Sequence, residues 1–391
     1  MKRLTLVIPS LTSGGAERVM TTLANAWADR GHEVTLITFD DSSATPFYPL
    51  NPGVELQQLG IAGNSSTKVA AIRNTISRIW KLRQAIQKSN PDLVLAFLDT
   101  TNVTTILASR GLGTPVIVEE HTDPAQKNLG QRWVRLRDAM YPRADRIVVL
   151  SEQSRSYFNE SIRRKTLIIP NPIVVEPATE PTRGWKQRRT LIALGRLGPE
   201  KGFDLLIDSF SRIESEFSTW DLVIWGDGAL RNELTAQIES LGLKGRISLP
   251  GRTQQPHDEL RHADIFVMSS RREGFPMALG EAMACGLPAI STDCPSGPRQ
   301  IIRDGIDGVL VEPENPDALA AAMRSLMSDE SLREAFAARA PEVLDRFGLE
   351  RVLAIWDDLF SEIEHARKPR ESRQIRTFGS TQTGTANGTD G

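Results

Sequence analysis

Short apolar runs alternate with amphipathic stretches along most of the chain, and this alternation predicts strands that alternate with helices. Leu4–Pro9 is an apolar run, and beyond a glycine-containing loop Val19, Leu23 and Trp27 recur at helical spacing. A strand over Val34–Phe39 is predicted to follow. A strand, a glycine loop, a helix and a second strand form the repeating unit of a parallel, doubly wound sheet.

The same order of elements returns in the second half of the chain. Thr190–Leu194 is predicted as a strand, a glycine-rich loop follows, and Phe203–Ile213 is predicted as a helix. Further strands are predicted at Leu93–Phe97, Pro115–Glu119, Arg146–Leu150, Leu222–Trp225 and Ile247–Leu249. The repetition predicts two similar domains that face each other.

These patterns predict an α/β chain with two Rossmann-like, doubly wound parallel-sheet domains that face each other across a cleft. The domains are placed at residues 1–175 and 190–345, and the proline-rich, charged residues 176–189 are read as the link between them. Residues 346–367 are expected to form a C-terminal helix. Residues 368–391 contain hardly any apolar side chains, so this tail is expected to be disordered.

Composition agrees with a chain of this kind. A length of 391 residues suggests two domains, and 40% hydrophobic with 25% charged residues is typical of a soluble globular protein. Two cysteines give no disulfide framework, and no run of about 18 apolar residues could span a membrane. The first apolar run is too short for the core of a signal peptide. We therefore expect a cytoplasmic location.

Charge is unevenly distributed, and two readings of it stay open. Residues 1–184 contain 22 Lys and Arg against 17 Asp and Glu, whereas the whole chain has 47 against 49. Residues 66–88 form a basic amphipathic pattern, and a second basic-aromatic stretch covers residues 131–137. This basic half is read either as a surface for anionic lipid or a diphosphate acceptor, or as ordinary solvated helix faces.

The densest candidate chemistry lies in residues 269–298, which read as a loop, a short helix, a strand and another loop. Glu273, Gly274 and Phe275 precede the helix, and Met277 and Glu281 lie within it. Backbone N–H groups of a glycine loop and of a helix N-terminus converge there and favour phosphate binding. Two carboxylates beside a phosphate site are suited to accept hydrogen bonds from hydroxyl groups. This favours a ribose on one side and a sugar ring on the other.

Two further loops are candidates for phosphate contact. Gly14 and Gly15 allow a ligand to approach the backbone at the start of the first helix. Arg196 and Lys201 lie on the corresponding loop of the second half, where two cations would neutralise a leaving diphosphate. The chain contains no Asp-x-Asp, so it offers no obvious carboxylate pair for a bridging metal ion. Two strand ends of the second domain, marked by Gly226 and Arg252, are suited to wall a nucleotide base.

The spacing of Glu273 and Glu281 resembles the Glu-x7-Glu signature of retaining, family-4-type glycosyltransferases with the GT-B fold. Residues 293–298 (DCPSGP) look like the version seen in members that build bacterial polysaccharides and lipid-linked oligosaccharides. The resemblance covers about residues 1–365. It implies an acceptor-side N-terminal domain, a nucleotide-sugar domain at 190–345 and a final helix that crosses back to the first domain.

The resemblance also implies roles for individual residues. His121 would contact the transferred sugar from the N-terminal domain, while Glu273 and the amides of Gly274 and Phe275 would hold the sugar hydroxyls. Glu281 would hold the ribose. Gly14 and Gly15 would lie beneath the donor diphosphate, with Arg196, Lys201, Gly226, Arg252 and Met277 completing the donor site.

The implied reaction is transfer of a hexose or N-acetylhexosamine, with retention, from a nucleotide diphosphate sugar. A UDP-sugar is favoured as donor and an undecaprenyl-diphosphate-linked saccharide as acceptor, with the protein peripheral on the inner membrane face. No cofactor, metal ion or nucleic acid is expected to take part. Two other functions stay open: a sugar-nucleotide isomerase or epimerase on the same fold, and a catalytically silent nucleotide-sugar-binding protein.

Overall fold

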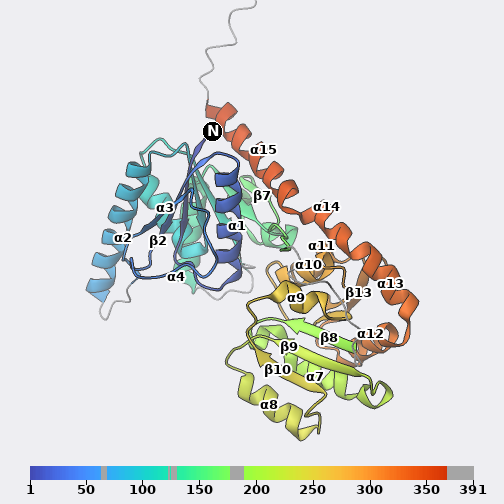
Figure 1. Ribbon diagram of the computed structural model, residues 1–391. Helices are drawn as coiled ribbons and strands as arrows, with labels where there is room; N and C mark the ends of the chain where they lie inside the picture. Colours follow the sequence, from blue (N-terminus) through green and yellow to red (C-terminus); the bar gives the residue numbers. More distant parts are fainter. Residues whose placement is uncertain (63–67, 122–123, 125–129, 177–188, 368–391) are drawn as a thin grey trace, which may run out of the picture.

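The computed structural model describes all residues except 63–67, 122–123, 125–129, 177–188 and 368–391. Two parallel sheets, one in each half of the chain, form the cores of two α/β domains (Figure 1). The prediction of two doubly wound domains is confirmed. Most of the predicted linker and all of the predicted disordered tail lie outside the described residues. None of the helices in the described ranges has the length and hydrophobicity that a membrane span needs.

The N-terminal sheet has seven strands in the order β3-β2-β1-β4-β5-β6-β7, with every neighbouring pair parallel. The order reverses at β1, which places the loops after β1 and β4 side by side at a topological switch point. The elements are β1 (Arg3–Ile8), α1 (Gly15–Asp29), β2 (Glu33–Thr38), β3 (Val54–Gln58), α2 (Lys68–Ser89), β4 (Leu93–Phe97), α3 (Asp99–Ser109), β5 (Val116–Glu120), α4 (Gln131–Met140), β6 (Arg146–Val149), α5 (Glu152–Tyr157), α6 (Glu160–Arg163) and β7 (Thr166–Ile168).

The C-terminal sheet has six parallel strands in the order β10-β9-β8-β11-β12-β13. Its switch point lies at β8, so the loops after β8 and β11 meet at the carboxyl edge. The elements are β8 (Arg189–Leu194), α7 (Phe203–Ser211), β9 (Trp220–Trp225), α8 (Arg231–Ser240), β10 (Ile247–Gly251), α9 (Pro256–Arg261), β11 (Ile265–Met268), α10 (Met277–Ala284), β12 (Ala289–Thr292), α11 (Pro298–Ile301), β13 (Gly308–Val311), α12 (Pro316–Ser328), α13 (Glu330–Arg339), α14 (Val343–Phe347) and α15 (Leu349–Arg367).

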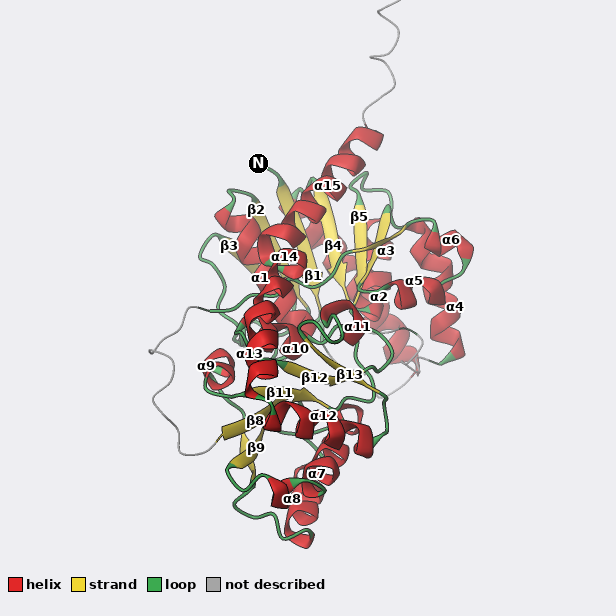
Figure 2. Cartoon of the chain, turned by 90° about the vertical axis from the view of Figure 1, so that its right-hand side faces the viewer, coloured by secondary structure: helices red, strands yellow, loops and turns green. Residues whose placement is uncertain are grey.

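The last helix, α15, packs on the N-terminal domain although it follows the C-terminal one. Figure 2 shows it in front of the N-terminal strands, and its apolar face joins the core formed by β1, α1 and β4. Trp27 of α1 and Trp356 of α15 meet edge to face with ring centroids 5.9 Å apart, and both are buried. Aromatic pairs of this geometry contribute about 0.5–1.5 kcal/mol beyond their buried area. This contact fixes where the chain returns to the first domain.

Several sequence predictions match the observed elements closely. The strand predicted at Leu93–Phe97 is β4, and the short helix predicted within residues 269–298 is α10, which Gly286 follows in a left-handed conformation at φ 82°. Strands β3, β7 and β11 are not among the predicted strands: β7 and β11 have only 3 and 4 residues, and the β3 sequence VELQQ is mostly polar. A single helix is predicted over residues 346–367, but extended backbone at Gly348 separates α14 from α15.

Two glycines allow the loops of the C-terminal domain to approach one another closely. Gly202 has φ 62°, and a Cβ atom there would lie 2.2 Å from the carbonyl oxygen of Ser269. Gly226 has φ 145°, and a Cβ atom there would lie 1.8 Å from the carbonyl oxygen of Gly195. Both positions need glycine because backbone, which cannot move aside, occupies the space. The loops after β8, β9 and β11 are thereby held together at the carboxyl edge of the sheet.

Candidate active site

A cleft of about 1020 Å³ separates the carboxyl edges of the two sheets and is lined from both domains. The loop after β1 and the end of β5 form one wall, while the loops after β8 and β11 form the other. Two of the predicted site residues, Gly226 and Arg252, are not among its described lining. The other ten line it: Gly14, Gly15, His121, Arg196, Lys201, Glu273, Gly274, Phe275, Met277 and Glu281.

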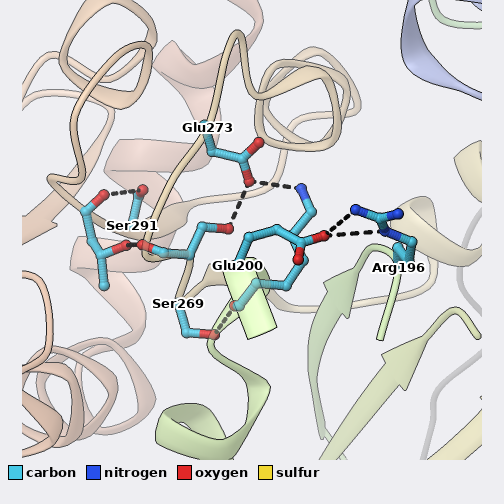
Figure 3. A network of polar contacts seen from close by, with 8 residues as sticks. Arg196, Glu200, Ser269, Glu273 and Ser291 are labelled. Carbon is cyan, nitrogen blue, oxygen red and sulfur yellow. Dashed lines mark hydrogen bonds and ion pairs between the residues drawn. The ribbon is translucent and has the colours of Figure 1, made fainter. Parts of the chain in front are cut away.

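Glu273 lies in a network of polar contacts in the cleft (Figure 3), where it forms an ion pair with Lys201. Nζ of Lys201 lies 2.7 Å from Oε1 of Glu273, and the Ser270 hydroxyl donates to the same oxygen at 2.6 Å. The Ser269 hydroxyl donates to the carbonyl of Lys201 at 3.0 Å, which ties the two loops together. Glu273 is nearly buried, at 9% exposed, so its orientation is fixed by neighbours before any ligand arrives.

The N-terminus of α10 faces the same space. Among the described residues, the backbone amides of Gly274 and Phe275 make no hydrogen bond, so their donors are available. Phe275 is buried and its ring packs edge to face on Phe347 at 5.5 Å, which anchors the loop. Free amides at a helix N-terminus attract an anion through orphan donors and the helix dipole. The loop is therefore suited to a phosphate or to sugar hydroxyls.

Arg196 is the more exposed of the two predicted diphosphate cations. Its guanidinium contacts Oε1 of Glu200 at 2.7 and 3.1 Å, and 74% of its side chain is exposed. Arg272 also lines the cleft, and within the described part of the chain no ion pair involves it. Sequence reasoning did not single out Arg272. Its position next to Glu273, in a loop that follows a buried strand, could have identified it as a cleft residue.

His121 faces the cleft from the N-terminal domain and rests on a buried carboxylic group. Nε2 of His121 lies 3.3 Å from Oε1 of Glu119, and the ring packs on Phe97 at 4.1 Å between centroids. Glu119 lies near the end of β5, and His121 directly follows the strand. Burial raises the pKa of Glu119 well above its usual range and lowers the pKa of His121 to about 3. The histidine is therefore neutral at physiological pH.

Glu281 lies deep in the cleft and is paired across the domain boundary. Its Oε1 is 2.7 Å from Nη1 of Arg18, and its Oε2 is 3.9 Å from Nε2 of His257. Burial raises the pKa of the Glu281 carboxyl, and the Arg18 charge opposes that rise. Neither His257 nor Arg18 is among the site residues predicted from the sequence. Arg18 lies one helical turn beyond Gly14, which is the signal that could have placed it in the cleft.

The two predicted residues outside the cleft lining have other surroundings. Gly226 packs against the backbone of Gly195 and supports the loop that bears Arg196. Arg252 is exposed. The pKa of the Asp227 carboxyl is lowered mainly by its hydrogen bond from Arg231, and the positive charge of Arg252 lowers it further. These positions border the loops that line the cleft.

Two Rossmann-like domains whose carboxyl edges enclose one cleft define the GT-B class of glycosyltransferase folds. The family model described as "Glycosyl transferases group 1" matches residues 178–343, and "Glycosyl transferase 4-like domain" matches residues 14–172. The chain belongs to this glycosyltransferase family and is a glycosyltransferase. The family predicted from the Glu-x7-Glu spacing is confirmed.

Relatives and solved structures agree with this assignment. The chain is 29% identical over 367 residues, 94% of its length and 100% of the relative's, to an alpha-1,4-N-acetyl-D-galactosaminyltransferase of Campylobacter jejuni whose name includes a PP-undecaprenol saccharide. It is 30% identical to an uncharacterized glycosyltransferase of Methanocaldococcus jannaschii, over 72% of this chain and 82% of that one. The crystal structure of Anabaena HepE with UDP and glucose matches with TM-score 0.73 at 19% identity, covering 93% of this chain and 100% of the other.

Proposed function

We propose that this protein is a retaining glycosyltransferase that moves a hexose or N-acetylhexosamine from a UDP-sugar to an undecaprenyl-diphosphate-linked saccharide. The observation that carries the proposal is the Lys201–Glu273 pair beside the free amides of Gly274 and Phe275, with His121 on the opposite wall. A sugar bound through a diphosphate needs a cation and N–H donors for the phosphates and a hydrogen-bond acceptor for the sugar hydroxyls. Lys201, the two amides and the Glu273 carboxylate supply these groups in one cleft.

The reaction breaks the bond between the anomeric carbon and the β-phosphate oxygen and forms a bond to an acceptor hydroxyl. Negative charge grows on the departing diphosphate, where Lys201, Arg196 and the α10 N-terminus stabilise it. Glu273 and His121 hold the sugar hydroxyls from opposite walls. The acceptor proton passes to the departing phosphate, which lies on the same face of the sugar as the attacking hydroxyl. Transfer on one face of the sugar then retains the anomeric configuration.

The charge that the diphosphate needs comes from side chains in this proposal, so the transfer needs no metal ion. Lys201, Arg196 and Arg272 all line the cleft. These three side chains bring positive charge to the place that a metal ion would occupy, and Lys201 is already oriented by Glu273. Chelator treatment should therefore leave the rate unchanged.

The acceptor is inferred from the relatives. The Campylobacter relative, matched over its whole length, is named for a PP-undecaprenol saccharide, and the HepE crystal structure holds UDP and glucose as its ligands. An undecaprenyl-linked acceptor stays in the membrane, so the enzyme must work at a membrane surface. Ile76 and Trp80 of α2 are 63% and 58% exposed on one side of the helix, with exposed Arg73 and Lys81 beside them. This surface fits the inner, anionic face of the cytoplasmic membrane.

The decisive experiment measures nucleotide release and product formation together. Purified full-length protein is supplied with UDP-glucose, UDP-galactose and their N-acetyl forms, each with and without undecaprenyl-diphosphate-linked saccharide. We expect UDP release only with both substrates, and an α-anomeric product by NMR when an α-linked donor is used. Conversion of the donor without acceptor, to an isomeric nucleotide sugar, would contradict transfer and support an isomerase.

A further inference from the structure

An aromatic pair stands at the N-terminal wall of the cleft and takes no part in the steps proposed above. Phe47 and Tyr48 lie in the loop between β2 and β3, and their rings meet at 80° with centroids 5.0 Å apart. Tyr48 lines the cleft, whereas Phe47 lies next to it, outside the lining, and is 49% exposed. Among the described residues, the Phe47 ring contacts no aromatic ring other than that of Tyr48.

Backbone contacts hold this aromatic pair in place. Pro46 and Pro49 flank it in the sequence, and their rings restrict the backbone torsions. The N–H of Phe47 donates to the carbonyl of Leu11 at 2.9 Å, and the side-chain amide of Asn25 donates to the carbonyl of Pro49 at 2.9 Å. The loop therefore loses little conformational freedom when a ligand packs on the Phe47 ring. A half-exposed ring held in this way is preorganised for contact with a ligand.

Glu17 supplies hydrogen-bond acceptors on the same wall. It lines the cleft from the first turn of α1, and its carboxylate folds back over the start of the helix, since a Cβ atom at Gly14 would lie 2.1 Å from Oε2. In the described part of the chain, the only side chain that donates to this carboxylate is Thr12, whose hydroxyl lies 3.3 Å from Oε1. Tyr48 is close by: its hydroxyl donates to the carbonyl of Ser13 at 3.4 Å. Burial raises the pKa of Tyr48, and the charge of Glu17 raises it further, so the phenol stays protonated.

The two walls of the cleft differ in charge. Lys201 and Arg196 line the C-terminal wall, where the diphosphate is stabilised in the proposed function. On the N-terminal wall, Arg18 is paired with Glu281, while Glu17 forms no ion pair within the described ranges. An unpaired carboxylate repels a diphosphate but accepts hydrogen bonds from hydroxyl groups. The N-terminal wall therefore suits an uncharged, hydroxyl-bearing group better than an anion.

A pyranose ring combines the two surfaces that this wall can bind, because its C–H bonds form an apolar face and its hydroxyls form a polar rim. We propose that Phe47, Tyr48 and Glu17 form the subsite for the terminal sugar of the acceptor saccharide. The apolar face of that sugar packs in the corner between the two rings, and a hydroxyl on its rim donates to Glu17. The inference rests on the proposed function, in which a saccharide acceptor meets the donor sugar between the walls. It assigns acceptor recognition to side chains that contact neither the nucleotide nor the diphosphate.

Steady-state kinetics separate acceptor recognition from donor recognition. The full-length protein is assayed with the four UDP-sugars named above and with undecaprenyl-diphosphate-linked N-acetylgalactosamine or N-acetylglucosamine in neutral detergent micelles. Phe47→Leu should raise the KM for the acceptor about 3- to 10-fold, because leucine is apolar but lacks the flat ring. Phe47→Tyr keeps the ring and should stay within about twofold of the wild type. Glu17→Gln should raise the acceptor KM about 3- to 10-fold, because a charged acceptor forms the stronger hydrogen bond.

The KM for the UDP-sugar should change by less than about twofold in Phe47→Leu and Glu17→Gln, because both side chains are assigned to the acceptor. Leu241→Ala is the control for loss of an exposed apolar side chain. Leu241 is 43% exposed and lies outside the cleft lining, so this variant should match the wild type in both KM values.

The outcomes separate the two levels of inference. An acceptor KM in Phe47→Leu equal to that of the wild type would overturn the subsite, since any apolar side chain, including one inserted in the micelle, would then suffice. A parallel rise in the KM for the UDP-sugar would overturn it too, because the loop would then shape the whole cleft. If Glu17→Gln does not fold, as judged by thermal unfolding, Phe47→Leu gives the answer, because Phe47 is half exposed. Absence of UDP release by the wild type with every donor and acceptor would contradict the proposed function itself.

Discussion

Nζ of Lys201 and Oε1 of Glu273 lie 2.7 Å apart, although 72 residues separate them in the chain. The glycine at 202 and the bond from Ser269 to Lys201 bring the two loops together, so the pair is formed by backbone packing rather than by chance surface contact. With 23% and 9% of their side chains exposed, the two groups are shielded from solvent screening. The cleft therefore presents a fixed charge arrangement to its ligand.

Glu273→Gln should lower the turnover number by at least about 100-fold, as for loss of one preorganised transition-state contact. The affinity for UDP should change by less than about threefold, because Glu273 is assigned to the sugar and not to the nucleotide. Nucleotide release and titration calorimetry measure the two quantities. Glu281→Gln is the matched comparison and should weaken UDP binding. The reverse pattern would mean that the two glutamates have exchanged roles.

Arg196→Ala should weaken binding of UDP by about 5- to 10-fold and leave binding of uridine unchanged. The effect is modest because Arg196 is 74% exposed and its charge is screened by water. Arg299→Ala is a close control, since Arg299 is also 74% exposed and paired with an aspartate, but lies outside the cleft lining. Equal effects of the two substitutions on UDP affinity would remove Arg196 from the diphosphate site.

Glu119 should make the protein less stable as pH rises. Burial raises its pKa in the folded state, so the fold keeps a proton that the unfolded chain loses above its usual pKa of 4.5. Its contribution to the free energy of unfolding is complete below that value and is lost as pH rises towards the folded-state pKa. Glu119→Gln keeps the shape of the neutral carboxyl, so its midpoint of thermal unfolding should gain on the wild type between about pH 5 and about pH 8.

His121 gives the opposite dependence and should be unaffected by that substitution. Its folded-state pKa of about 3 lies below the usual 6.5. Both the wild type and Glu119→Gln should therefore lose stability as the pH falls from about 6.5 towards about 3. Glu55→Gln, on the exposed side of β3, is the control and should leave the pH profile unchanged. A Glu119→Gln profile parallel to that of the wild type from acid to base would show that Glu119 is ionised in the fold.

The sequence allowed local structure to be predicted well and contacts between domains poorly. Glu273, Gly274 and Phe275 could be predicted as site residues because the glycine loop, the start of the helix and the following strand are consecutive in the sequence. The pairing of Arg18 with Glu281 could not, because hydrophobic periodicity says nothing about how two domains meet. His257 looked ordinary in sequence, since its partners come from α1, α10 and the backbone at residue 176. Gly226 stays a predicted wall of the base site, while its φ and its closeness to Gly195, which the sequence did not reveal, give it a role in loop packing.

The exposed apolar side of α2 should bind anionic membranes. Figure 1 shows α2 on the outer side of the N-terminal domain, away from the C-terminal domain. Burying Trp80 and Ile76 in the interface contributes about 1.5–3 kcal/mol each, so Ile76→Ser/Trp80→Ser should lower vesicle partitioning by at least about tenfold. Sedimentation with phosphatidylglycerol and phosphatidylcholine vesicles measures this, and only the anionic vesicles should bind strongly at low salt.

The control for this surface is a second pair of exposed apolar residues on the other domain. Leu241 and Ile306 are 43% and 44% exposed, so Leu241→Ser/Ile306→Ser removes a similar kind of side chain without touching α2. We expect that variant to bind phosphatidylglycerol vesicles as the wild type does. Thermal unfolding should be unchanged in both double variants, because none of the four side chains is buried. If the α2 variant binds vesicles as well as the control variant, α2 is an ordinary solvated helix and the acceptor is reached through another surface.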